Sequence, residues 1–157
     1  MKTNIGLTEA GAKGSAAILN HALADAHVLY MKLRQYHWNV TGPNFSELHK
    51  LFETQYDQIE EAIDAVAERI RSLGKFPLGT LKEMLQEAKL KESTADNLDA
   101  SKMIRNLLED HEHIIRELRE GLKACDEQYG DMGTSDFLTG LMEEHEKMAW
   151  MLRAYLE

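Results

Sequence analysis

The sequence predicts an all-α fold: a four-helix bundle with a short extra helix in the crossover between the second and third long helices. Three observations carry this prediction. Apolar residues recur every three or four positions along four long stretches, which is the spacing of one face of an α-helix. Among 157 residues, 43% are hydrophobic, 29% are charged and only two are proline. Both prolines, Pro43 and Pro77, lie between these stretches. A chain of this length is expected to form one domain.

The first helix is predicted from about Ser15 to about Val40, where Gly42 and Pro43 end it. Residues 1–14 before it are predicted to be a flexible N-terminal tail, so that residues 15–157 form the bundle domain.

The second helix is predicted from Asn44 or Phe45 to Leu73, followed by Gly74. This helix and the first both exceed 25 residues, so each is expected to be about 40 Å long.

A long crossover is predicted over residues 75–98. Thr80 is followed three residues later by Glu83, which is the pattern of a capping box, and it predicts a short helix over residues 81–88.

Two further helices follow the crossover. Asp99 or Asn97 is expected to cap the third, whose apolar stripe reaches Cys125, and a glycine-containing turn at 130–133 leads to a fourth stripe at 138–155. Short links join the helices of each pair, so each pair forms an antiparallel hairpin, and one long connection joins the two pairs. This connectivity is the ferritin-like arrangement of a four-helix bundle.

Charge and composition restrict the classes of function. A formal net charge of −9 disfavours a bare nucleic-acid binder, because affinity for a polyanion depends on Lys and Arg, and it favours cations as partners. One cysteine, Cys125, excludes an intrachain disulfide and fits a reducing compartment, so the cytoplasm is expected. Asn20, His21 and Asp25 interrupt the apolar stretch 16–26, so neither export nor membrane insertion is indicated.

Two histidines and two acids, His37, His49, Asp64 and Glu68, lie within 32 residues on the first two predicted helices. Asp64 and Glu68 are four residues apart, so their side chains project from one face of the second helix. Imidazole nitrogen combined with carboxylate oxygen suits iron, manganese or zinc better than calcium or magnesium. The pattern therefore predicts a reactive metal site.

Such a site is expected on the flank of the bundle. No histidine has a glutamate three residues before it, so the usual Glu-x-x-His motif of in-bundle di-iron sites is absent. His37 follows Tyr36 of the apolar stripe and is rotated about 100° from it. A site on the flanks of the first two helices is completed naturally by a neighbouring subunit, and two-fold symmetry then gives two identical sites at each dimer interface.

Simpler interpretations compete with this one. His37 can instead be a surface histidine beside Trp38, and Asp64 and Glu68 can belong to a solvated helix face. His111 and His145 lie on apolar stripes and are interpreted as hydrogen-bonded core histidines. Three other histidines are left outside the predicted site. His21 and His113 are interpreted as surface or partner-facing residues, and His27 is an ambiguous extra ligand.

A family resemblance follows from these motifs. The run Tyr36-His37-Trp38-Asn39-Val40-Thr41-Gly42 is followed by an ordered series of single residues and pairs: Phe45, Leu48-His49, Phe52-Glu53, Tyr56, Asp64 and Ala67-Glu68-Arg69. With a Gly-x-x-Pro segment at 74–77 and the run His145-Glu146-Lys147-Met148-Ala149-Trp150-Met151-Leu152-Arg153, this pattern closely resembles the Dps proteins, the mini-ferritins. The likeness spans nearly the whole chain.

The resemblance implies a ferroxidase: a hollow homo-dodecamer that oxidises Fe²⁺, preferably with H₂O₂, and stores the Fe³⁺ product inside, protecting against oxidative stress. His37 and His49 would come from one subunit and Asp64 and Glu68 from its two-fold partner. Glu53, where many members have Asp, would contribute at a second, weaker iron position. Trp38 would act beside the site as an electron donor or radical trap.

The resemblance also implies iron-entry pores lined by acids at the start of the fourth long helix. Asp131 and Asp136, with Glu127, fit that position, and a plain acidic turn with a helix-dipole contact from Asp136 is the equal alternative. Some members coat DNA through lysine-rich tails, which would make the protein nucleoid-associated. Here the charged side chains of the first 17 residues are only Lys2, Lys13 and Glu9. DNA binding is therefore expected to be weak or absent. A DNA-compacting shell with a vestigial metal site is the alternative function.

Overall fold

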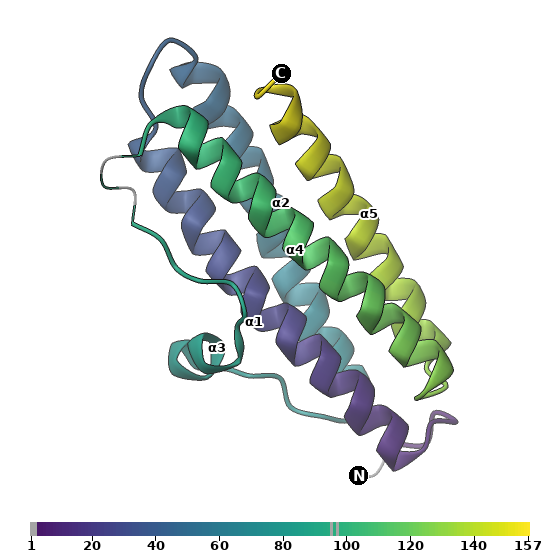
Figure 1. Ribbon diagram of the computed structural model, residues 1–157. Coiled ribbons are helices and arrows are strands. Elements are labelled where there is room, and N and C mark those ends of the chain that lie inside the picture. The colour runs from purple at the N-terminus through teal and green to yellow at the C-terminus, as the bar shows by residue number, and fades with distance from the viewer. Residues whose placement is uncertain (1–2, 95, 97) are drawn as a thin grey trace.

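The computed structural model describes residues 3–94, 96 and 98–157. These residues form five helices, and within this described part there are no strands: α1 (Glu9–Asn39), α2 (Phe45–Ser72), α3 (Leu81–Glu87), α4 (Ala100–Glu127) and α5 (Met132–Ala154). The four long helices lie side by side, with the short α3 beside α1 in the crossover (Figure 1). The predicted all-α bundle is confirmed. None of the helices in the described ranges is long and apolar enough to span a membrane.

Two hairpins make up the bundle. Short links join α1 to α2 and α4 to α5, and α1 also packs against α4. Gly42 makes the first link possible with a φ of +115°, a conformation that residues with a Cβ rarely adopt. The crossover runs along α1 from one end of the bundle to the other, so that α4 starts near the end of α1 (Figure 1).

Side chains of α1 hold the crossover in place at three levels. Asn20 Oδ1 accepts a hydrogen bond from the backbone N–H of Leu78 (2.9 Å). Asp25 Oδ1 accepts from the N–H groups of Lys89 (2.7 Å) and Leu90 (2.9 Å). Further along, the hydroxyl groups of Tyr36 and Ser93 lie 2.7 Å apart. Within the crossover, the predicted capping box between Thr80 and Glu83 is confirmed as the start of α3.

One helix boundary departs from the prediction. α1 begins at Glu9, six residues before the expected start at Ser15, so residues 9–14 are helical and the flexible-tail prediction is wrong for them. The Thr8 side chain accepts a hydrogen bond from the N–H of Gly11 (3.0 Å), which satisfies a donor of the first turn. At the start of α4, Asp99 is the cap, as predicted. Its alternative, Asn97, lies outside the described residues.

The core lies between the four long helices and is closely packed. Its largest fully buried side chains include Tyr36 and Phe52, whose rings are 6.5 Å apart. Gly121 of α4 faces Ile18 of α1, and a Cβ at that glycine would come within 2.8 Å of the Ile18 methyl group. Glycine at 121 therefore lets α1 and α4 approach each other closely, which matters for the groups that these two helices share.

Candidate metal centre

His37 and His49 form a reciprocal pair where α1 ends and α2 begins. The Nδ1 atom of His37 lies 2.7 Å from the carbonyl oxygen of His49, and the Nδ1 atom of His49 lies 2.8 Å from the carbonyl oxygen of His37. The two imidazole rings stack with their centroids 3.7 Å apart and an interplanar angle of 20°. The structure therefore brings the two predicted nitrogen ligands together.

Local folding explains why these residues meet. The short α1–α2 link places the last turn of α1 against the first turns of α2. Carbonyl groups in the last turn of a helix lack an intrahelical partner, and the His49 ring supplies one to His37. Aromatic rings flank the pair, with Phe45 5.2 Å from the His49 ring and Tyr56 edge-on to the His37 ring at 5.3 Å.

These hydrogen bonds determine which nitrogen of each ring is available. A carbonyl oxygen only accepts hydrogen bonds, so the Nδ1 atoms of His37 and His49 carry the protons. In a neutral imidazole the Nε2 atom then keeps its lone pair. A backbone carbonyl that holds the other nitrogen is the usual outer partner of a metal-binding histidine. Both rings are thus in the form that binds a metal ion through Nε2.

Glu53 lies one helical turn after His49 and close to both rings. Its carboxylate accepts a hydrogen bond from Lys50 (2.7 Å), and this contact lowers the pKa of Glu53, with smaller contributions from His37 and His49. The group is therefore ionised at neutral pH. It faces the histidine pair as a carboxylate whose present partner is an exposed lysine.

Trp38 is exposed beside the histidine pair, with 58% of its surface accessible. The guanidinium group of Arg34 lies 5.3 Å from the Trp38 ring and 5.3 Å from the Tyr56 ring, and it donates a hydrogen bond to the Tyr30 hydroxyl (2.7 Å). Arg34 thus connects three aromatic side chains near the site. Burial is the main cause of the raised pKa of Tyr56, so its phenol stays protonated at neutral pH.

Asp64 and Glu68 are on the same helix but far from the histidines. Fifteen residues separate His49 from Asp64, which corresponds to about 22 Å along α2. Both carboxylates are exposed, and within the described residues neither has a hydrogen-bond or ion-pair partner. Their like charges one turn apart repel each other, and a cation would relieve that repulsion. In this single chain the structure does not bring the two acids to the two histidines.

A family model for the ferritin-like domain matches residues 16–157. The DNA protection during starvation protein of Brevibacillus brevis is 40% identical over 142 residues, which cover 90% of this chain and 94% of that protein. A low temperature-induced protein of Nostoc sp. is 48% identical over 156 residues, which cover 99% of this chain and 87% of that protein.

The crystal structure of a Dps protein from Vibrio cholerae superimposes with a TM-score of 0.92 at 36% identity, covering 100% of this chain and 98% of that one. The chain belongs to the Dps family. The Vibrio protein is described as a member of a broad superfamily of ferritin-like diiron-carboxylate proteins. The predicted family resemblance is confirmed.

The acids predicted to line a pore in this Dps chain differ in their surroundings. Asp131 is buried and caps α5, accepting hydrogen bonds from the N–H and hydroxyl groups of Thr134 and from Arg69 (3.1 Å). Burial alone would raise the pKa of Asp131, but these contacts lower it. Asp131 therefore caps α5, and a role for it in a pore stays a prediction. Glu127 and Asp136 are exposed, and their pore role stays a prediction.

His111 and His145 are core residues, as their apolar surroundings predicted. Their Nδ1 atoms lie 2.9 Å apart between α4 and α5. Burial lowers the pKa of His145 to about 4, and burial together with His145 lowers the pKa of His111 well below its usual value. His27, the ambiguous histidine, donates from Nδ1 to the Leu23 carbonyl (2.9 Å). His27 lines a cavity of about 640 Å³ together with Asp64, so it lies near the acids and not near the paired histidines.

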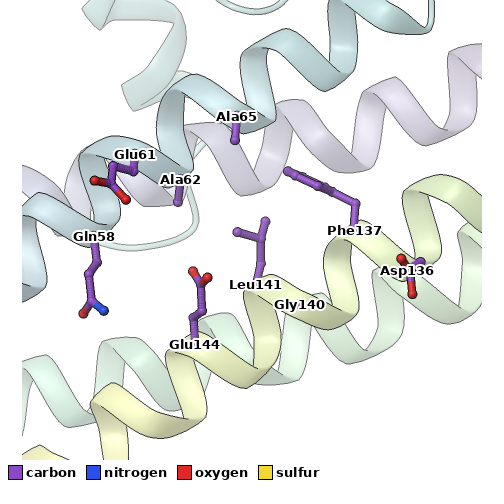
Figure 2. A pocket seen from close by; sticks show the side chains of 9 residues that line it. All are labelled: Gln58, Glu61, Ala62, Ala65, Asp136, Phe137, Gly140, Leu141 and Glu144. Carbon is purple, nitrogen blue, oxygen red and sulfur yellow. The ribbon is translucent and has the colours of Figure 1, made fainter.

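A separate acidic groove of about 480 Å³ lies between α2 and α5 (Figure 2). Phe137 and Leu141 project from α5 toward α2 in its middle, with Glu61 and Glu144 toward one end and Asp136 at the other. None of the five predicted metal ligands lines this groove. It gathers negative charge on the face formed by α2 and α5, away from the histidine pair.

His21 and His113 are of intermediate exposure, which is compatible with the predicted surface or partner-facing positions. Both are partly buried, and both Nε2 atoms point toward Asp25, itself only 2% exposed. The sequence contains a spacing that indicates this arrangement: Asp25 stands four residues after His21, and His113 stands four residues before Glu117. Each pair thus shares a helix face, on two helices that pack together.

Proposed function

We propose that this Dps-family chain is a ferroxidase that oxidises Fe²⁺ at a site shared by two copies of the chain and stores the ferric product. One observation carries the proposal. His37 and His49 present two Nε2 lone pairs where α1 ends and α2 begins. Asp64 and Glu68 lie about 22 Å along α2, and their carboxylates have no hydrogen-bond or ion-pair partner among the described residues. Each half of the ligand set is prepared for a metal ion, and each lacks the other half within its own chain.

A two-fold axis would unite the halves. If two α2 helices run antiparallel across such an axis, the histidine end of one faces the carboxylate end of the other, and two equivalent sites form. Among the described residues of one chain, no three His, Cys, Asp or Glu side chains are already arranged around a metal position. This agrees with a site that only assembly completes. The proposed assembly is a homo-dodecamer of such dimers.

The proposed reaction treats Fe²⁺ as substrate. Two Fe²⁺, one H₂O₂ and two protons give two Fe³⁺ and two water molecules, so the peroxide bond accepts both electrons without releasing hydroxyl radical. Carboxylate oxygens from Asp64, Glu68 and Glu53 stabilise the rising positive charge on iron. Neutral imidazoles favour Fe²⁺ at the start of the reaction. Whether O₂ competes with H₂O₂ as oxidant is decided by kinetics.

The supporting residues receive roles within the same proposal. Glu53 would leave Lys50 and hold the second, weaker iron. Trp38 would donate an electron when only one Fe²⁺ is bound, because its ring is exposed beside the site and contacts Arg34. Glu127 and Asp136 are the proposed pore acids. The cytoplasm, where Fe²⁺ is available, is the proposed compartment.

A DNA-compacting shell is the second candidate, since one relative is named for DNA protection during starvation. Charge opposes it. Twelve chains of net charge −9 would carry −108 formal charges, and the first 17 residues, whose basic side chains are Lys2 and Lys13, offer little to offset this repulsion. We expect no mobility shift of plasmid DNA at submicromolar protein and about 0.15 M salt. A clear shift would favour the DNA-binding shell.

Complementation between two inactive variants tests the shared site. His37→Ala and Asp64→Ala should each lose the fast peroxide-driven oxidation of Fe²⁺ while still assembling. When the two are unfolded, mixed in equal amounts and refolded together, half of the dimers combine one chain of each kind, and each mixed dimer has one intact site. About one quarter of the wild-type activity should therefore return.

A site contained within one chain predicts a different result, because no mixed dimer would then hold an intact ligand set. Activity that stays at the level of the separate variants, although native mass shows mixed oligomers, would overturn the proposal. Co-refolding His37→Ala with His49→Ala is the matched control. Both lesions then lie in the same half of the ligand set, and no activity should return.

A further inference from the structure

A second group of histidines and carboxylates lies where α1, α4 and the crossover meet. Asp25 of α1 is buried, and its Oδ1 atom accepts the two backbone hydrogen bonds that hold the crossover. Its other oxygen, Oδ2, faces two imidazole nitrogens, His21 Nε2 at 3.5 Å and His113 Nε2 at 3.8 Å. His21 Nε2 also lies 3.6 Å from Glu117 Oε2. Four donor atoms from two helices therefore face one another.

Hydrogen bonding identifies the form of His21. Its Nδ1 atom lies 3.2 Å from the carbonyl oxygen of Glu87, and a carbonyl only accepts, so Nδ1 carries the proton. In the neutral ring, the Nε2 atom of His21 then directs a lone pair at the oxygens of Asp25 and Glu117. Groups that all carry lone pairs repel one another unless a positive charge lies between them.

The two buried imidazole nitrogens have no hydrogen-bond partner that could relieve the repulsion between these lone pairs. Both His21 Nε2 and His113 Nε2 are inaccessible to solvent and make no hydrogen bond. Lys89 donates a hydrogen bond to Glu117 Oε2 (2.5 Å), the same oxygen that faces His21 Nε2, but it does not bond to the imidazoles. This hydrogen bond lowers the pKa of Glu117, so that carboxylate is ionised. A metal ion would bind both unpartnered nitrogens at once; the alternative is a proton on the Nε2 atom of one imidazole, directed at Asp25 Oδ2.

The spacing suits a metal ion. In a tetrahedral zinc site, metal–ligand bonds of about 2.1 Å separate neighbouring ligand atoms by roughly 3.4 Å. The three separations here are 3.5, 3.6 and 3.8 Å. A cavity of about 30 Å³ lies against His21, Asp25 and Glu117, and its other walls are apolar. In the described residues no three such side chains are already arranged around a metal ion, so the donors must move closer together when the ion binds.

We propose that a divalent transition-metal ion, best matched by Zn²⁺, binds between α1 and α4 through His21, His113 and Asp25, with Glu117 as the fourth ligand. Two nitrogen and two oxygen donors in this geometry are typical of zinc. His21 stands 16 residues before His37, about 24 Å along α1, so this site is separate from the proposed ferroxidase site. The bound ion joins α1, α4 and the crossover through Asp25 and the Glu87 carbonyl.

Zinc binding to the full-length protein tests this site. The background variant His37→Ala/His49→Ala removes the proposed ferroxidase ligands, so zinc bound there is not counted. After chelator treatment, competition with a chromogenic zinc chelator should show one tightly held Zn²⁺ per chain. Adding His113→Ala should weaken that binding at least tenfold. Glu117→Gln should also weaken it, whereas Glu120→Gln, on the exposed face of the same helix, should not.

Crystals of the unaltered protein soaked in Zn²⁺ provide a measurement that no substitution can disturb. Anomalous scattering at the zinc edge should place an ion within bonding distance of His21 Nε2 and Asp25 Oδ2. No anomalous peak between the two helices, or unchanged zinc affinity in the folded His113→Ala variant, would show that a proton occupies the cluster and would overturn the proposal. Because the readout is zinc and not iron oxidation, the result is independent of the proposed ferroxidase function.

Discussion

Two histidine pairs in this chain have the same composition and opposite surroundings. His37 and His49 give their Nδ1 protons to each other's backbone carbonyls and stack near the surface. His111 and His145 instead bond to each other through Nδ1, at 2.9 Å, in the centre of the bundle. In the first pair both Nε2 atoms keep a lone pair. In the second pair one ring must donate and the other accept, so the two rings satisfy each other.

The partner of Nδ1 thus distinguishes the proposed metal-binding pair from the buried pair. Backbone carbonyls are fixed acceptors, and they direct the remaining nitrogen outward for a ligand. A second imidazole in a buried position offers no such direction, and burial keeps both rings neutral, as the lowered pKa values of His111 and His145 indicate. Residue type alone does not distinguish the two pairs, and their hydrogen bonds do.

The largest expected effect comes from removing a nitrogen ligand. His49→Ala should slow peroxide-driven oxidation of Fe²⁺ by about a hundredfold or more, since even outer partners of metal ligands contribute 10- to 100-fold. Stopped-flow absorbance of the ferric product measures this. His145→Leu, in the buried pair, is the matched control and should keep the wild-type rate. Equal losses in both variants would show that the two pairs do not differ in the way proposed.

Acid stability should depend on the buried pair. The fold favours neutral His145, so between pH 4 and 6.5 the unfolded chain binds more protons than the folded one, and stability falls as the pH is lowered through this window. A pKa lowered from 6.5 to about 4 corresponds to a loss of about 3 kcal/mol. The double variant His111→Leu/His145→Leu should not lose this stability at low pH, because leucine side chains do not bind protons in either the folded or the unfolded state.

Thermal unfolding at fixed protein concentration, measured from pH 7.5 down to about 4, provides the comparison for this second pair. His37→Ala serves as the control that retains the buried pair and should still show the acid loss. If the double leucine variant lost stability with the same pH dependence as wild type, other groups would account for acid sensitivity, and the contrast between the pairs would rest on iron chemistry alone.

A smaller effect is expected at Glu53. Glu53→Gln removes the negative charge beside the histidine pair, so anaerobic titration should give about one tightly bound Fe²⁺ per site in place of two, with a several-fold slower oxidation. Glu53→Asp keeps the charge and should retain both irons. Two irons bound with undiminished affinity in the glutamine variant would remove Glu53 from the proposed site.

Much of this architecture was predictable from sequence, and the reason differs between elements. The four stripes and the capping box of Thr80 and Glu83 are local patterns, so the helices and the crossover followed directly. The start of α1 was not predicted, because the residues that follow Thr8 are small and form no apolar stripe. The environment of His21 and His113 depends on Asp25 and on how closely α1 approaches α4, and no local pattern encodes that approach.

The metal ligands occupy a middle position in this respect. His37 and His49 are twelve residues apart, and a short link brings them together within one chain, so the helix-turn-helix pattern was enough to pair them. Asp64 and Glu68 could be placed on one face of α2, but in the proposed site their counterpart belongs to a second copy of the chain. A single-chain pattern or structure can indicate such a site only by leaving its two halves incomplete.

The smallest expected effect concerns the lysine that now holds Glu53. Lys50 is largely exposed, and its contact with Glu53 competes with any iron that binds this carboxylate. Lys50→Ala should therefore strengthen binding of the second Fe²⁺ by at most a few fold, because exposed ion pairs contribute under about 1 kcal/mol. It should also raise the pKa of Glu53, since the hydrogen bond from Lys50 is the main cause of its lowering, so below about pH 5 the gain should turn into a loss. Anaerobic titrations at the two pH values measure both effects, with Lys123→Ala as a control for net charge. Weaker binding of the second iron at neutral pH would instead mean that Lys50 positions Glu53 for iron and does not compete with it.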